Sequence, residues 1–258
     1  MDPYPFELLS EGYGAFVCSK RASDLSCSIS RQADNTFVVE LQGNPPQTAP
    51  DSYELIYAFE KGITIELQKI RRDLLFLHSA ALEYDGQACL LVAAAGSGKS
   101  TTTWALLHHG FRYLSDELAP IDLRTRDVHP YPHALCLKAD PPTPFDLPEK
   151  VIRTAHTIHV PVSQMPAEVC RRPAHLAAVF FVRYDPAATR PMVAPISRAE
   201  AGARIYSNAL NLLAHERYGL DAAVTVANNS ESFELVSADL IQTSELMKSV
   251  MQEIPGAS

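Results

Sequence analysis

A short glycine-containing loop near the middle of the chain constrains the fold more than any other feature. Residues 93–101 read AAAGSGKST and begin at the last residue of the apolar run Ala88–Ala93, which predicts a strand buried on both faces. A helix is expected from about Lys99 to His109. A strand, a glycine loop and a helix in this order are the context of a phosphate-binding P-loop, or Walker A motif. The sequence therefore predicts an α/β fold that binds ATP or a related nucleotide together with Mg²⁺.

The residue types of this loop suit phosphate chemistry. Gly96 and Gly98 allow the backbone to curl, so that successive N–H groups face the phosphate oxygens. The N-terminus of the following helix adds a partial positive charge. Lys99 can reach the β- and γ-phosphates, and the hydroxyl of Ser100 can bind Mg²⁺. We assign nucleotide binding to Ala95, Gly96, Ser97, Gly98, Lys99, Ser100 and Thr101.

The loop departs from the usual pattern at its first position, where Ala93 replaces glycine. If this position needs a positive φ, alanine costs roughly 1–2 kcal/mol. If it needs only a small side chain, alanine costs little. The sequence leaves both possibilities open.

An acidic pair, Asp116-Glu117, follows the next predicted strand, Phe111–Leu114, and begins 17 positions after Lys99. Carboxylates at such a site hold Mg²⁺ directly or through water, and one of them could deprotonate an attacking hydroxyl. The short interval leaves room only for a helix and one strand. We therefore expect the acidic strand immediately after the P-loop helix, and we predict Ser100, Asp116 and Glu117 as metal ligands.

Three histidines need separate interpretation. His78 lies in the apolar run Leu75–Ala81, which predicts a strand, and a lone histidine in such a run is more often a hydrogen-bonded core residue than a catalyst. His129 and His133 have prolines between them, which exclude a helical pair of metal ligands. With no third ligand nearby, we interpret these two as loop residues.

Composition excludes several classes of protein. A net charge of −8 argues against a general binder of nucleic acid or of anionic membranes. No apolar stretch reaches the length of a membrane span, and the N-terminus lacks the features of a signal peptide. The five cysteines are odd in number and include no CxxC pair, so neither a disulfide framework nor a zinc cluster is expected. These features fit the cytoplasm best.

The chain divides into a small strand-rich N-terminal layer, 1–48, and a core, 49–258, which we expect to form one compact unit. The strands of the layer are predicted at Gly12–Cys18 and Thr36–Gln42, from their β-branched and aromatic residues. A helix is expected next, from Asp51 or Ser52 to about Asp73.

Downstream of the acidic pair, proline-rich residues 130–175 predict long surface connections. A strand is then expected at Leu176–Tyr184. A capping box of Ser197 and Glu200 begins a helix that we expect to reach about Tyr218. A final strand, Ser232–Ser237, precedes a terminal amphipathic helix, Asp239–Glu253.

A histidine strand, a P-loop and an acidic pair one strand later together resemble HPr kinase/phosphorylase. The resemblance is strongest from Leu77 to Asp122 and is closer still to the HPr-kinase-related proteins of bacterial peptide-modification and exosortase-type gene clusters, including lasso-peptide kinases. It implies the fold shared with phosphoenolpyruvate carboxykinase, a P-loop in a mixed, twisted sheet with helices packed outside.

The resemblance also implies roles for single residues. Lys99 and Ser100 would hold nucleotide and metal, and Asp116 would accept the hydroxyl proton. Glu117 would be a metal ligand or lie behind one, and His78 would orient the acidic group. The catalytic residues implied are therefore Asp116, His78 and Lys99.

One feature of HPr kinase is missing, a glutamate–arginine signature with a glycine-rich stretch after the acidic pair. Here the corresponding region, Tyr131–Lys138, leads into proline-rich sequence. Phosphorylase activity and HPr itself as the acceptor are therefore not implied. Lys138 or Arg171 is a candidate for the missing positive charge.

We expect a kinase that moves the γ-phosphoryl group of ATP to a serine or threonine hydroxyl of a small protein or peptide. The expected partners include this acceptor and a second copy of the chain, but neither nucleic acid nor a membrane. A small-molecule kinase and a nucleotide sensor without transfer remain alternatives.

Overall fold

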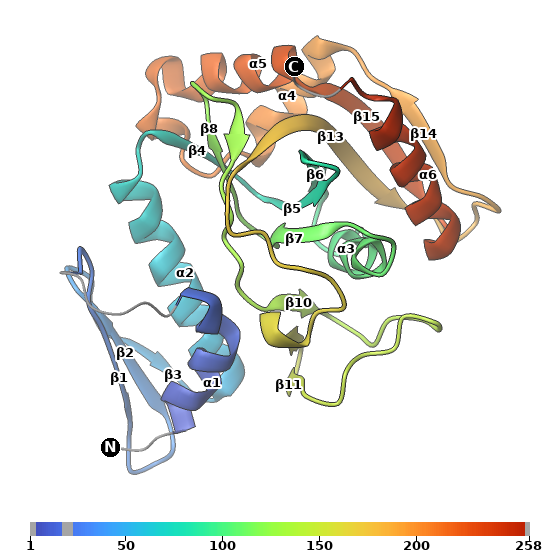
Figure 1. Ribbon diagram of the computed structural model, residues 1–258. Helices are drawn as coiled ribbons and strands as arrows, with labels where there is room; N and C mark the ends of the chain where they lie inside the picture. The colour runs from blue at the N-terminus through green and yellow to red at the C-terminus, as the bar shows by residue number, and fades with distance from the viewer. Residues whose placement is uncertain (1–3, 17–22, 256–258) are drawn as a thin grey trace.

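The computed structural model describes residues 4–16 and 23–255 and shows a mixed sheet with helices on both faces (Figure 1). Within this part of the chain the largest sheet has nine strands. Seven of them lie in the order β4 (Leu74–Leu77), β8 (Ala119–Asp122), β9 (Asp127–Val128), β13 (Ala174–Tyr184), β6 (Gln87–Val92), β5 (Ser79–Tyr84) and β7 (Arg112–Ser115). β15 (Glu231–Ser237) pairs parallel with β13, and β14 (Met192–Pro195) pairs antiparallel with β15.

Alternating side chains of the central strands divide the core into two layers. On one face, Phe180 and Leu91 pack with α3 (Lys99–Leu107) and α6 (Leu240–Glu253). On the other face, Phe181 packs with α4 (Arg198–Asn208) and α5 (Leu220–Asn229). The expected α/β fold, a mixed sheet with helices packed outside, is therefore confirmed.

The strand that carries the P-loop is held on both edges. β5 and β6 form an antiparallel hairpin, and its turn residues Asp85 and Gly86 both have positive φ, as the Asp-Gly pair predicts. On its other edge β6 pairs parallel with β13. Because β6 is buried on both faces, its continuous apolar run is the pattern of a central strand.

The N-terminal layer contains α1 (Tyr4–Tyr13), a 3₁₀ turn (Gly14–Phe16) and a sheet of β1 (Cys27–Arg31), β2 (Phe37–Leu41) and β3 (Gln47–Ala49). The strand predicted at Gly12–Cys18 is wrong: α1 extends through Tyr13 and the 3₁₀ turn through Phe16, while residues 17 and 18 lie outside the described part. The rings of Tyr13 and Phe16 lie 5.8 Å apart, because residues three apart meet on one side of a helical turn.

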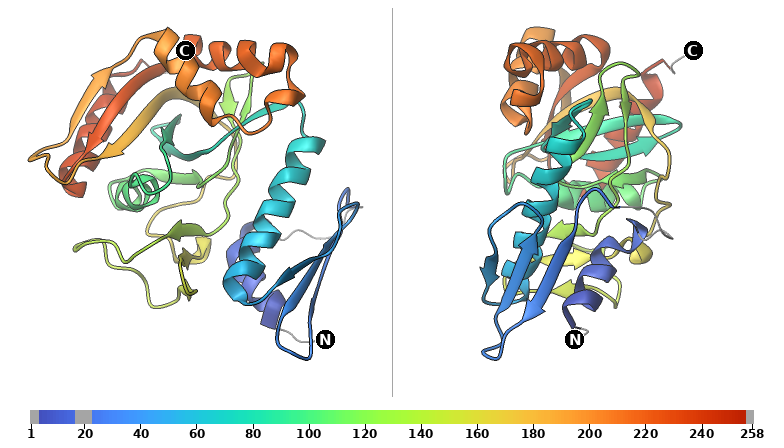
Figure 2. Two further views of the ribbon diagram at one scale, coloured as in Figure 1. Left: turned by 180° about the vertical axis from the view of Figure 1, so that it is seen from behind. Right: turned by 90° about the vertical axis from the view of Figure 1, so that its left-hand side faces the viewer.

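Helix α2 (Ser52–Ile70) joins this layer to the rest of the molecule (Figure 2). The side chain of Asp51 accepts a hydrogen bond from the backbone N–H of Glu54, which confirms the expected N-cap. Leu55 and Ile56 are buried against β2 and β3. The helix ends at Ile70, three residues before the predicted end.

The proline-rich segment is more ordered than expected, because it contains a small sheet of β10 (Leu135–Leu137), β12 (Ile158–Val160) and β11 (Ile152–Arg153). These strands are too short to produce a periodic sequence pattern.

The helix predicted from Ser197 to Tyr218 begins correctly, since Ser197 caps it, but α4 ends at Asn208. The chain there extends along β4, where Leu210 N–H donates to the carbonyl of Phe76. Two 3₁₀ turns (Leu212–Ala214 and Glu216–Gly219) then lead to α5. Within the described ranges, no helix combines the length and apolar character needed to cross a bilayer.

Candidate phosphate and acidic-pair site

The P-loop leaves β6 and opens α3, as the sequence predicts. Gly96 (φ 83°) and Gly98 (φ 87°) occupy the left-handed region that favours glycine. Ala93 is not among the residues with positive φ, and its side chain is buried. Alanine at the first position therefore introduces no backbone strain, which answers the question that the sequence left open.

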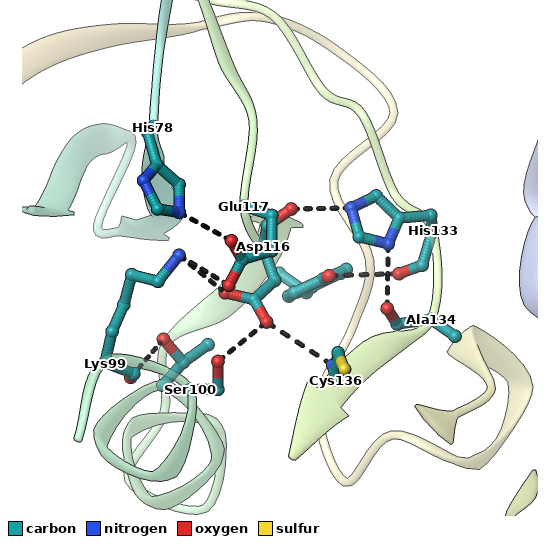
Figure 3. A network of polar contacts seen from close by, with 10 residues as sticks. His78, Lys99, Ser100, Asp116, Glu117, His133, Ala134 and Cys136 are labelled. Atoms are coloured by element: carbon teal, nitrogen blue, oxygen red, sulfur yellow. Dashed lines mark hydrogen bonds and ion pairs between the residues drawn. The ribbon is translucent and has the colours of Figure 1, made fainter. Parts of the chain in front are cut away.

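Lys99, the first residue of α3, points its side chain toward Asp116 and Glu117, which lie between it and His133 (Figure 3). Its side chain is buried, and its Nζ lies 2.7 Å from Glu117 Oε1 and 3.8 Å from Asp116 Oδ1. The lysine thus bridges the acidic pair across the end of β7. Its charge is buried and lies close to the P-loop.

Asp116 is completely buried, and its two oxygens differ. Oδ2 accepts a hydrogen bond from Ser100 Oγ at 2.9 Å and is 3.4 Å from the backbone nitrogen of Cys136. Oδ1 has no hydrogen-bond partner among the described residues. A buried carboxylate oxygen without a donor is costly unless a cation completes its surroundings, so this oxygen beside a serine hydroxyl fits Mg²⁺.

Mg²⁺ is usually held by one or two carboxylates together with substrate phosphates and water. The described residues contain no cluster of three histidine, cysteine or acidic side chains that would bind a metal without such help. The donor set therefore suits a metal that arrives with the nucleotide better than a permanently bound one.

Glu117 faces outward from the same turn. Its side chain is about half exposed, and its Oε2 lies 2.6 Å from Nε2 of His78. Burial raises the pKa of Glu117, but the hydrogen bond from His78 and the charge of Lys99 outweigh it and lower the pKa to about 2. The residue adopts a left-handed backbone (φ 67°), which is uncommon for a side chain of this kind.

The run Leu75–Ala81 predicts a single strand that contains His78, but His78 lies between two strands. The run breaks at this residue into β4 and β5, and the backbone N–H of His78 donates to the carbonyl of Asn208. The break directs the imidazole to Glu117 rather than into the core, and within the described part of the chain His78 forms no hydrogen bond or ion pair with Asp116.

His133 was missed as part of this site, because the prolines around it indicate a loop. The ring is buried, and its two nitrogens face the carbonyl oxygens of Asp116 and Ala134. The phenol of Tyr113 donates to the backbone oxygen of His133 at 3.0 Å. His133 therefore fixes the backbone that presents the acidic pair. His129 lies elsewhere, with its backbone N–H on the carbonyl of Pro120.

A cleft of about 630 Å³ opens in front of these residues. One wall consists of the P-loop, His78 and Glu117, and the other is the face of α2 that runs from Tyr53 to Gln68. Lys138 borders the cleft, whereas Arg171 is not among its described lining residues. The sequence predicts this helix but gives no signal that one of its faces lines a cleft.

Comparison with known proteins gives a distant structural likeness. No family model matches the chain, and neither does any curated protein. Among solved structures, the Hpr(Ser) kinase/phosphatase from Coxiella burnetii aligns with a TM-score of 0.35 at 13% identity, over 69% of this chain and 88% of that chain. This is a coarse likeness in the arrangement of elements, so function must be sought in the side chains of the site.

Proposed function

We propose that this protein is an ATP-dependent kinase that transfers the γ-phosphoryl group to a hydroxyl. The observation that carries the proposal is the pairing of Ser100 with Asp116 at 2.9 Å, with a second Asp116 oxygen left open beside Lys99. A nucleotide site that only binds phosphate needs the loop and the lysine. A buried carboxylate in contact with the P-loop hydroxyl serves a metal at the transferring phosphate.

Asp116 and Ser100 would hold Mg²⁺, which neutralises negative charge on the transferring phosphoryl group when it is bound. Lys99 would exchange Glu117 for phosphate oxygens, and the N–H groups of residues 95–101 would surround the phosphates. These residues work by positioning and by charge, which is how most phosphoryl transfer is catalysed.

One carboxylate of the acidic pair would accept the proton of the attacking hydroxyl. The resemblance to HPr kinase implies Asp116 for this role. A second observation supports Glu117 instead, because Glu117 lines the cleft and contacts His78, whereas Asp116 is buried against Ser100. Proton acceptance requires hydrogen-bond reach to the hydroxyl. When Lys99 turns to phosphate, Glu117 loses a partner that lowers its pKa and becomes a stronger base.

We further propose that the cleft admits a serine or threonine of a small protein or peptide other than HPr. The P-loop forms one wall, so an acceptor placed against α2 would face the transferring phosphoryl group. The cleft extends along α2 from Tyr53 to Gln68, which is about 22 Å of helix at 1.5 Å per residue. A wall of this length suits a chain segment better than a compact metabolite. Self-association and a cytoplasmic site of action remain part of the proposal.

The decisive test is transfer of label from γ-labelled ATP with Mg²⁺ to peptides encoded beside the gene of this protein. Wild type is compared with Lys99→Ala, Asp116→Asn and Glu117→Gln, and nucleotide binding is measured for each. Label on a peptide serine or threonine, lost in Lys99→Ala, supports the kinase. If Glu117→Gln loses transfer but still binds nucleotide, and Asp116→Asn does not show this combination, the base is assigned to Glu117.

Two outcomes contradict the proposal. Tight nucleotide binding that depends on Lys99, with no transfer to peptides, small hydroxyl compounds or water, indicates a nucleotide sensor. No nucleotide binding by the wild-type protein removes the basis for both functions.

A further inference from the structure

Strand β13 continues beyond its partner β6 and so reaches the P-loop. The last pair between the two strands joins Phe181 to Val92, the final residue of β6, and the loop begins at Ala93. β13 extends three residues further to Tyr184, supported on its other edge by β15, where Tyr184 pairs with Ser237. Three residues of strand span about 10 Å. The end of β13 therefore runs beside the phosphate loop.

Tyr184 lies on the face of the sheet from which α3 starts. Side chains alternate along a strand, and the preceding residues of this face, Phe180 and Val182, are buried in the core layer that contains α3. Tyr184 continues that row beyond the edge of the core and is 52% exposed. A Cβ placed on Gly98 would lie 3.5 Å from the Cβ of Tyr184, so the tyrosine is in contact range of the loop.

The direction of a bound nucleotide follows from the strand order β13–β6–β5–β7. The acidic pair lies at the end of β7, so the transferring phosphate must point toward that side of the P-loop strand. The nucleoside is at the other end of the same molecule. It must therefore extend toward β13, on the opposite side of β6, where Tyr184 is exposed.

We propose that Tyr184 is the platform on which the base of the bound nucleotide stacks. This inference rests on the proposed nucleotide binding at the P-loop and adds a base site to it. An aromatic ring recognises the flat face that every base presents, and removal of such a ring weakens binding by roughly 1–3 kcal/mol. That corresponds to about a 5- to 150-fold loss of affinity. The cleft in front of Glu117 then remains free for the acceptor.

A second exposed tyrosine provides a matched control. Tyr57 on α2 is 51% exposed and lines the cleft on the acceptor side of the P-loop. If the base lay in the cleft, Tyr57 and not Tyr184 would contact it. The two residues therefore distinguish the two positions of the nucleoside with the same chemical change.

The experiment is calorimetric titration of the full chain with Mg²⁺–ATP and, separately, with Mg²⁺–tripolyphosphate, which has phosphates but no base. Tyr184→Ala should weaken ATP binding at least fivefold and leave tripolyphosphate binding within twofold. Tyr184→Phe should bind both ligands like wild type, and Tyr57→Ala should leave both affinities unchanged.

Retained tripolyphosphate binding shows that the Tyr184→Ala loop is folded. Equal weakening of both ligands overturns the inference, because Tyr184 would then only support the loop. An ATP-specific loss in Tyr57→Ala also overturns it and places the base in the cleft. If wild type binds ATP and Lys99→Ala does not, while Tyr184→Ala matches wild type, the base site alone fails. If wild type binds neither ligand, the proposed function fails with it.

Discussion

The first residue of the phosphate loop carries a methyl group where the P-loop pattern has glycine. Because Ala93 has no positive φ, we expect Ala93→Gly to change the affinity for Mg²⁺–ATP by less than about twofold. Gly98→Ala should weaken Mg²⁺–ATP binding, since a φ of 87° strains any side chain by roughly 1–2 kcal/mol and the backbone of this residue would face the bound phosphates. Titration calorimetry checks both variants. A large gain in Ala93→Gly would show that Ala93 had weakened the site.

Glu117 has a proposed role in phosphoryl transfer and a backbone of unfavourable positive φ. Two substitutions should separate the effect on transfer from the effect on stability. Both Glu117→Ala and Glu117→Gly remove the contacts with Lys99 and His78. Glycine also relieves the left-handed strain of about 1–2 kcal/mol. Part of this gain is offset, because glycine gives the unfolded chain more conformational entropy. We expect Glu117→Gly to be more stable than Glu117→Ala by about 1 kcal/mol in urea unfolding, with phosphoryl transfer lost in both. An alanine variant as stable as the glycine variant would show that the turn is unstrained.

At this scale, sequence predicts the residues whose type is dictated by phosphate chemistry. Lys99, Ser100 and Asp116 meet in space because a P-loop strand, one helix and one further strand leave little freedom in their placement. Their roles stay predictions. The contribution of His133 could not be predicted, because it depends on a carbonyl 17 residues away and on the short strands that follow the histidine.

At the scale of elements, β12 contains a buried histidine with a pH consequence. Burial, and the charge of His133, lower the pKa of His159 to about 4, well below the value of about 6.5 in an unfolded chain. Between these values the unfolded state binds a proton that the folded state does not bind, so stability decreases as pH falls. We expect this residue to reduce the free energy of unfolding by about 2 kcal/mol between pH 7 and pH 5.

His159→Gln should remove that part of the pH dependence, because glutamine keeps a polar group for Thr157 and does not titrate. His156→Gln is the matched control, since His156 is exposed on the loop just before β12. Urea unfolding of the three proteins at pH 7, 6 and 5 measures the difference. Parallel pH profiles for wild type and His159→Gln would contradict the expectation.

Elements with a long periodic pattern were predictable, and elements that depend on a distant edge were not. α2 and α6 have apolar faces and capping residues that define them locally. In contrast, the extended segment after Asn208 forms because the outer edge of β4 requires backbone partners: the side chain of Asn211 bonds both Phe76 N–H and the carbonyl of Leu74. Such a pairing leaves no local pattern, so the sequence alone predicts that the helix from Ser197 continues past Asn208.

At the scale of the whole molecule, α2 connects two regions that the sequence places in different layers. One side of this helix packs Leu55 against the N-terminal sheet, another side forms the wall of the cleft, and Ile56 contributes to both. A boundary at residue 48 would therefore divide a shared core. The physical reason is that three short strands cannot bury their own apolar face without the helix.

This arrangement predicts that the N-terminal layer and the P-loop region unfold together. Phe37 is buried in β2 against α2, and Phe37→Ala should destabilise the protein by about 3 kcal/mol. Trp104, the single tryptophan of the chain, lies in the core layer around α3 and reports on the P-loop region. In urea unfolding of Phe37→Ala, tryptophan fluorescence and far-ultraviolet circular dichroism should show one midpoint, lowered equally for both signals.

Met247→Ala, a buried change in α6 near Trp104, serves as the comparison and should also give coincident midpoints. If Phe37→Ala instead produces an early loss of circular dichroism while the fluorescence midpoint stays at its wild-type value, the N-terminal layer is a separate unit. The wall of the cleft would then be able to leave the P-loop without unfolding the core.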